Sequence, residues 1–179
     1  AAVNAAEQTP VTIKFRKGID DDHLTFLDSG RIAQESGCVG VTLHARTAAD
    51  LYSGHADWDA IAELVQTIDI PVFGNGDIWE PWDAVRMIRH TGAAGVEIGR
   101  GCLGRPWLFA DLVSVLEGKG PQFTQPTLEL VAKVMTDHAT RLLEFYDEDE
   151  TTVIRRFRKH AGWYVAGWPV GKELRRRLH

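Results

Sequence analysis

Residues 70–78 read IPVFGNGDI, an apolar and β-branched run that stops abruptly at Gly74, Asn75, Gly76 and Asp77. A continuous apolar run of this length is typical of a parallel strand that is covered on both faces. In α/β barrels, the loops that leave the C-terminal ends of such strands carry the chemistry. Because glycine has no Cβ, the backbone at Gly74 and Gly76 can turn sharply and approach a ligand closely. The stretch therefore predicts a buried strand that ends in a ligand loop.

A second loop of the same kind follows one strand later. Residues 95–101 read GVEIGRG, an apolar run that ends in glycines around Arg100. Backbone amides and one guanidinium suit a phosphomonoester, and barrels often bind phosphate with the loops after their last strands. A Gly-Asn-Gly-Asp segment alone is commonly only a turn. Two such loops, one strand-helix unit apart, favour a shared ligand site.

Composition places the chain among globular proteins. It has 179 residues, of which 44% are hydrophobic, and a net charge of −5, which suits one domain with an appendage. Its apolar stretches fall short of the roughly 20 residues that cross a bilayer, and its N-terminal residues lack a signal-peptide pattern. We therefore expect a cytoplasmic protein without a membrane partner. Cys38 and Cys102 have no CxxC spacing, so the sequence indicates neither a disulfide framework nor a zinc site.

Two earlier strands are predicted to deliver polar side chains to the same end of the sheet. Residues 10–15, PVTIKF, form a strand-like run with Lys14 near its end. A lysine there either extends into solvent or holds an anionic ligand. Residues 39–43 form the next strand and lead into His44, with Arg46 two residues on. A lone histidine is more often structural, but a strand terminus beside an arginine favours a functional role.

Amphipathic helices are predicted between these strands. They cover residues 23–35, 58–67 and 78–90, and we expect Trp82 and Met87 of the last helix to pack on the sheet. Strands and helices thus alternate through about a hundred residues, without a hairpin signal. This rhythm predicts an α/β fold, either half of a (β/α)8 barrel or a small doubly wound parallel sheet.

The last third of the chain changes character. A linker rich in Gly, Pro and Gln at residues 117–126 separates residues 1–116 from residues 127–179, whose periodicity is helical. Residues 1–150 hold 12 basic and 24 acidic side chains, whereas residues 151–179 hold 8 basic and 1 acidic. A basic helix is usually a solvated face, but basic clusters with interleaved aromatic residues are better explained by a phosphate backbone. The first basic cluster comprises Arg155, Arg156, Arg158 and Lys159.

Several ordered motifs together resemble one known family. They are PVTIKFR, LHART followed by YSGHADW, PVFGNGDI, GVEIGRGCLGRPWLF and RKHAGWYVAGWP, and they span nearly the whole chain at coherent spacing. The chain resembles the C-terminal part of a tRNA-dihydrouridine synthase of the bacterial type. The resemblance implies the C-terminal half of a (β/α)8 TIM barrel, which holds a flavin, followed by an all-helical C-terminal domain that helps to hold tRNA.

The resemblance also implies a reaction. Members of the family bind FMN and use NADPH to reduce the C5–C6 bond of selected uridines in tRNA. By motif, Lys14 matches the lysine near the isoalloxazine, where its charge stabilises the anionic reduced flavin, and His44 matches the histidine beside the flavin. Arg46 and Tyr52 fall in the loop on the substrate side. The ribityl and phosphate contacts of the family match Asn75, Gly76, Asp77, Gly99 and Arg100.

In the family, the general acid is a cysteine on a loop after an earlier barrel strand, and neither Cys38 nor Cys102 matches it. No catalytic residue is therefore expected in this chain. We expect a truncated product that is silent alone and pairs with the missing N-terminal half of the barrel or with a second copy, because a half barrel exposes two sheet edges. Two alternatives stay open: another flavin-binding or phosphate-binding barrel enzyme, and a non-catalytic RNA-binding fragment.

Overall fold

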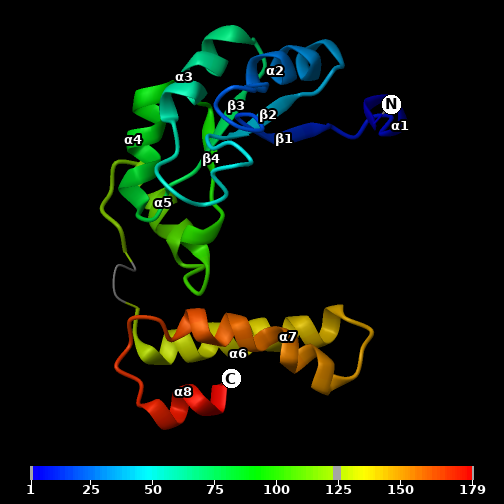
Figure 1. The fold of residues 1–179 in the computed structure, drawn as a ribbon. Helices are drawn as coiled ribbons and strands as arrows, with labels where there is room; N and C mark the ends of the chain where they lie inside the picture. Colours follow the sequence, from blue (N-terminus) through cyan, green and yellow to red (C-terminus); the bar gives the residue numbers. More distant parts are fainter. Residues whose placement is uncertain (1, 123–125, 179) are drawn as a thin grey trace. The chain divides into compact units, whose positions relative to one another are not determined.

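The computed structural model describes residues 2–122 and 126–178 (Figure 1). The chain divides into two compact units, Ala1–Gly101 and Cys102–His179. The division falls directly after the glycine-rich loop that contains Arg100. Residues 1 and 179, at the ends of the two predicted domains, and residues 123–125, inside the predicted linker, lie outside the described part.

A parallel sheet of four strands forms the centre of the first unit. The order of the strands across the sheet is the same as their order in the chain, so that β1 and β4 are its edges. This arrangement confirms the predicted α/β fold with parallel strands. The strands are β1 (Thr12–Arg16), β2 (Gly40–His44), β3 (Val72–Asn75) and β4 (Gly95–Glu97).

Helices pack on the sheet between successive strands, as they do in strand-helix-strand units (Figure 1). Gly74 of β3 allows close packing there, because a Cβ at this position would lie 2.4 Å from the sulfur of Met87 and 3.3 Å from Cδ1 of Ile61. The fully buried core includes Val41, Leu43, Ile61, Leu64 and Met87. The helices of this unit are α1 (Ala2–Ala5), α2 (Phe26–Glu35), α3 (Trp58–Thr67) and α4 (Pro81–Thr91).

The start of α4 differs from the prediction. The helix begins at Pro81 instead of residue 78, because Glu80 and Asp83 form a capping box and proline suits the first turn. Trp82 is exposed, so the prediction that it packs on the sheet is wrong, whereas Met87 is fully buried as predicted. The later start leaves the two residues before Glu80 in the loop that follows β3.

The other helices of the first unit follow the sequence pattern more closely. α3 occupies the predicted residues 58–67. α2 begins at Phe26, three residues later than expected, because Gly18 and Leu24 form an isolated antiparallel bridge that keeps the preceding segment out of the helix. α4 ends at Thr91 and is capped by Gly92, whose φ of 72° is the left-handed conformation of a helix C-cap.

Helices account for the regular structure that is described in the second unit. A 3₁₀ turn at Arg100–Cys102 joins the two units, and α5 begins at Leu108. Val131 of α6 packs with Phe157, Ala161 and Tyr164 of α7 in a small apolar core. Within the described ranges, no helix has both the length and the apolar character of a bilayer-spanning segment. The helices are α5 (Leu108–Leu116), α6 (Leu128–Phe145), α7 (Glu150–Tyr164) and α8 (Lys172–Leu178).

Candidate functional site

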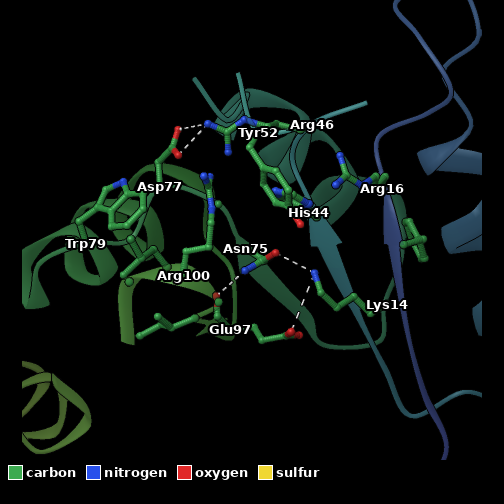
Figure 2. A pocket seen from close by; sticks show the side chains of 16 residues that line it. Lys14, Arg16, His44, Arg46, Tyr52, Asn75, Asp77, Trp79, Glu97 and Arg100 are labelled. Carbon is green, nitrogen blue, oxygen red and sulfur yellow. Dashed lines mark hydrogen bonds and ion pairs between the residues drawn. The ribbon is translucent and has the colours of Figure 1, made fainter. Parts of the chain in front are cut away.

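The last residues of the four strands form one row across the sheet. Arg16 pairs with His44, His44 with Asn75, and Asn75 with Glu97. The loops that follow these strands therefore gather at the C-terminal end of the sheet, where open α/β sheets bind ligands. They line a pocket of about 380 Å³ (Figure 2). All nine site residues that the sequence predicts in this unit line it, namely Lys14, His44, Arg46, Tyr52, Asn75, Gly76, Asp77, Gly99 and Arg100.

Asn75 connects the strands on either side of the pocket floor. Its Oδ1 accepts a hydrogen bond from Lys14 Nζ at 2.7 Å, and its Nδ2 donates to the carbonyl oxygen of Glu97 at 2.7 Å. Lys14 Nζ also lies 3.9 Å from a carboxylate oxygen of Glu97. Burial lowers the pKa of the Lys14 ammonium, although the Glu97 carboxylate opposes this shift. The sequence leaves open whether Lys14 extends into solvent or holds a ligand. In the structure, Lys14 lines the pocket.

His44 lies between cationic side chains. Burial is the largest cause that lowers the pKa of His44 to about 4, and the charges of Lys14, Arg16 and Arg46 add to it. An imidazole with this pKa is neutral at pH 7. One ring nitrogen then donates a hydrogen bond and the other accepts one, so His44 acts as a dipole in the pocket and not as a charge.

Arg46 joins the loop after β2 to the loop after β3. Its side chain is only 2% exposed, and its Nη2 donates to both carboxylate oxygens of Asp77, at 2.8 and 3.0 Å. Its Nε donates to the carbonyl oxygen of Ser53 at 3.0 Å and its Nη2 also to that of Gly54 at 2.8 Å. Its Nη1 is buried and has no hydrogen-bond partner among the described residues. Since a buried unpaired donor costs about 1–3 kcal/mol, Nη1 is available to an acceptor on a ligand.

The backbone after β3 is held in an uncommon conformation. Gly76 has a φ of 127°, and Asp77 has a φ of 56°, which non-glycine residues rarely adopt. A Cβ on Gly76 would lie 2.6 Å from Cβ of Ala56. Burial alone would raise the pKa of Asp77, but hydrogen bonds from the Ala56 amide and the Arg46 guanidinium hold it below its ordinary value. The Asp77 carboxylate thus serves as a support for the loop.

The pocket also contains residues that the sequence patterns do not predict as site residues. Arg16 and Glu97 line the pocket, and both end strands, so the strand-end argument applied to Lys14 and His44 could have found them. Trp79 also lines the pocket. No sequence signal indicated it, because residues 78–90 read as one helix.

Comparison with known proteins identifies the family. A family model described as "Dihydrouridine synthase (Dus)" matches residues 1–179. The chain belongs to the dihydrouridine synthase family. The family resemblance that the motifs indicated is therefore confirmed.

The relatives of this dihydrouridine synthase segment are longer proteins. It is 54% identical over 181 residues to the "Probable tRNA-dihydrouridine synthase" of Mycobacterium tuberculosis, an alignment that covers 99% of this chain and 46% of the relative. It is 39% identical over 178 residues to the "tRNA-dihydrouridine synthase B" of Pseudomonas putida, covering 99% of this chain and 52% of that protein. The chain thus spans about half the length of the curated relatives it matches.

The basic residues predicted to contact tRNA lie on α7, in the other unit of this dihydrouridine synthase segment. Arg155, Arg156, Arg158 and Lys159 are all exposed. Arg156 is engaged within its own unit, since its Nη2 donates to Glu148 at 2.7 Å and its guanidinium lies 5.0 Å from the centre of the Tyr146 ring. The charge of Arg156 is therefore less available to RNA than an unpaired charge would be.

The two cysteines of this dihydrouridine synthase segment lie outside the pocket. Cys38 is buried and precedes β2, at the opposite end of the strands from the pocket. Cys102 closes the 3₁₀ turn after β4. Neither thiol lines the pocket, so neither is positioned to protonate a ligand bound there.

Proposed function

We propose that this chain supplies part of the FMN site and the tRNA-binding helices of a tRNA-dihydrouridine synthase, which uses NADPH to reduce the C5–C6 bond of uridine in tRNA. The observation that carries the proposal is the meeting of Lys14, His44, Asn75 and Arg100, from four successive strand ends, in one pocket of a chain of this family. The names of the relatives support the reaction. A tRNA substrate favours the cytoplasm as its compartment.

The residues that line the pocket fit FMN. Lys14 and Arg100 supply positive charge for an anionic ring and a phosphate, and the unpaired Nη1 of Arg46 suits a carbonyl oxygen. Gly76 brings its backbone close to the pocket without a side chain. At Gly99, apart from the glycine itself and its two chain neighbours, no heavy atom of the described residues lies within 4 Å of the place that a Cβ would take, which leaves room for a ligand. When bound, FMN supplies hydride transfer.

The side chains of this segment would then bind and orient. Asn75 holds Lys14 Nζ at one point of the pocket, and the ammonium has further N–H groups that could donate to a ligand. His44 is neutral at pH 7 and can donate or accept one hydrogen bond without adding charge. We propose that the proton for C5 of the uracil comes from a cysteine outside this chain, because Cys38 and Cys102 do not line the pocket.

We propose the same domain organisation that the sequence predicts. Residues 1–116 form the C-terminal half of a TIM barrel, residues 117–126 a linker, and residues 127–179 an all-helical domain that binds tRNA. β1 is an open edge whose first three residues are exposed. An open edge of this kind can pair with another strand. That strand would come either from the part of the protein that the longer relatives have in addition or from a second copy of the chain.

A non-catalytic RNA-binding fragment is the second candidate. The exposed cations Arg155, Arg158 and Lys159 of α7 favour it. It gives no role, however, to the buried donor of Arg46 or to the lysine held at the strand ends. Flavin binding separates the two candidates, since an RNA-binding fragment has no need of it.

A chimera tests the proposed function. The chain replaces the matching 46% of the Mycobacterium tuberculosis relative, and the purified chimera is examined for flavin absorbance and for NADPH-dependent dihydrouridine in tRNA by mass spectrometry. We expect bound FMN and product, and we expect both to be lost in the chimera with Lys14→Ala and Arg100→Ala. A folded chimera without flavin would overturn the proposal, and one with flavin but no product would limit it to cofactor binding.

A further inference from the structure

The guanidinium of Arg100 lies between two aromatic side chains that come from different loops (Figure 2). Its Cζ lies 4.4 Å from the centre of the Tyr52 ring and 5.4 Å from that of the Trp79 ring. Tyr52 belongs to the loop after β2, Trp79 to the loop after β3, and Arg100 follows β4. Three consecutive strand ends thus meet at one cation.

Both rings are exposed to solvent, so burial in the core does not explain why they lie here. Tyr52 is 59% exposed and Trp79 is 44% exposed, and both line the pocket. An exposed aromatic side chain gains little from the hydrophobic effect, so its contribution here comes from the cation that it touches. A guanidinium that stacks on rings keeps the N–H groups in its own plane free for an oxyanion.

The loop that carries Tyr52 is fixed from β1. Arg16 Nη1 donates to the carbonyl oxygens of Thr47 and Leu51, at 2.7 and 3.1 Å. The guanidinium of Arg16 also lies 5.8 Å from the centre of the Tyr52 ring. Leu51, which directly precedes the tyrosine, has a φ of 52°. A non-glycine residue keeps this conformation only where its surroundings enforce it.

The loop that carries Trp79 is fixed from α4. The backbone N–H of Trp79 donates to Oδ2 of Asp83 at 2.9 Å, beside the capping box of the helix. Two residues before it, Asp77 has a φ of 56° and is bound by Arg46. Both ring-bearing loops are therefore held in place by contacts within the protein, with no need of a ligand.

We propose that Tyr52 and Trp79 form an aromatic clamp that positions Arg100 to bind the phosphate of FMN, and that Trp79 is a positioning residue of this site. The inference rests on the proposed function. An arginine that is held in its binding conformation loses less side-chain freedom when the phosphate arrives. The clamp therefore strengthens binding of the phosphate and leaves binding of the flavin ring unchanged.

A comparison of FMN with riboflavin, which lacks the phosphate, tests the clamp. Titration of each ligand against the flavin-free chimera described above, followed by flavin fluorescence, gives the two dissociation constants. For Trp79→Ala we expect the Kd of FMN to rise about 3- to 5-fold and that of riboflavin to stay within about 1.5-fold. Trp79→Phe keeps a ring and should restore most of the FMN affinity. The matched control is Trp82→Ala, which removes another exposed tryptophan of the same segment.

The outcomes separate the clamp from the flavin site itself. In the background of Arg100→Ala, Trp79→Ala should have no further effect on FMN, because the cation that it positions is gone. An equal loss of FMN and riboflavin, or no loss of either, would overturn the clamp while the proposed function stands. A wild-type chimera that binds neither ligand would overturn the proposed function and the clamp together. Unchanged riboflavin affinity also shows that the variant is folded.

Discussion

Asn75 Oδ1 accepts a hydrogen bond from Lys14 Nζ at 2.7 Å, although 61 positions separate the two residues in the chain. The bond passes from β1 to β3 over the end of β2, and the Asn75 amide continues it to β4 by donating to the Glu97 carbonyl. One short side chain thus ties together the strands that supply the pocket. A network of this kind fixes the lysine more firmly than a single surface contact would.

Asn75→Ala should weaken the fold and the site together. It leaves the Lys14 ammonium and the Glu97 carbonyl without their partner, and we expect the free energy of unfolding to fall by about 1–2 kcal/mol in urea denaturation. The affinity for FMN should fall as well, because Lys14 is no longer held. Asn4→Ala is the matched control, since Asn4 is exposed and lies in the short N-terminal helix. Equal stability of the two variants would contradict the role of Asn75.

Arg46→Met should be far more costly than the loss of a surface arginine. The substitution leaves the Asp77 carboxylate partly buried without its cation, and we expect a loss of about 3 kcal/mol in the free energy of unfolding. Arg31→Met breaks an ion pair of the same chemistry, with Asp28, that is exposed to solvent, and it should cost less than about 1 kcal/mol. Similar losses for the two variants would show that the Arg46 pair does not hold the loops.

The low pKa of His44 predicts a specific dependence of stability on pH. Its pKa is about 4 in the folded chain and about 6.5 in the unfolded chain, so between these values the unfolded chain binds the additional proton. Stability should therefore fall as the pH is lowered from about 6.5 to about 4. NMR titration of the imidazole should give an apparent pKa near 4, and His44→Gln should flatten the stability curve within this window. A midpoint near 6.5 would contradict the described environment.

Much of this site follows from where strands end. The apolar runs before His44 and Asn75 place these residues at the C-terminal end of a parallel sheet. The pattern of residues 95–101 does the same for Arg100. These features can be predicted from local sequence patterns, together with the rule that the C-terminal ends of parallel strands lie at the same end of the sheet.

What the sequence does not carry is the choice among distant partners. Nothing local indicates that Arg46 binds Asp77, which is 31 residues away, or that Arg156 binds Glu148 instead of facing RNA. The sequence pattern places Trp79 in a helix, but the capping box at Glu80 makes that helix begin three residues later. Such pairings are settled by the folded geometry, since several charged side chains of each sign are available to every arginine.

Arg158→Ala should weaken tRNA binding more than Arg156→Ala does. Both residues are exposed, but the charge of Arg156 is already paired with Glu148. Loss of Arg158 should reduce the slope of log K against log salt by about 1, as loss of one phosphate contact does. Glu148→Gln should release Arg156 and strengthen binding. Equal effects of the two alanine variants in filter binding at several salt concentrations would contradict this ordering.

The central claim is that four successive strand ends form one FMN site. Hydrogen-exchange mass spectrometry of the flavin-free chimera, with and without added FMN, measures it most directly, because a bound ligand slows exchange in the backbone that it orders. We expect slower exchange in the segments after β1, β2, β3 and β4, including residues 16–18, 44–47, 75–79 and 97–101, and no change in α6. Saturating FMN that leaves all four segments unaffected, or protects only the helices of the second unit, would contradict the account.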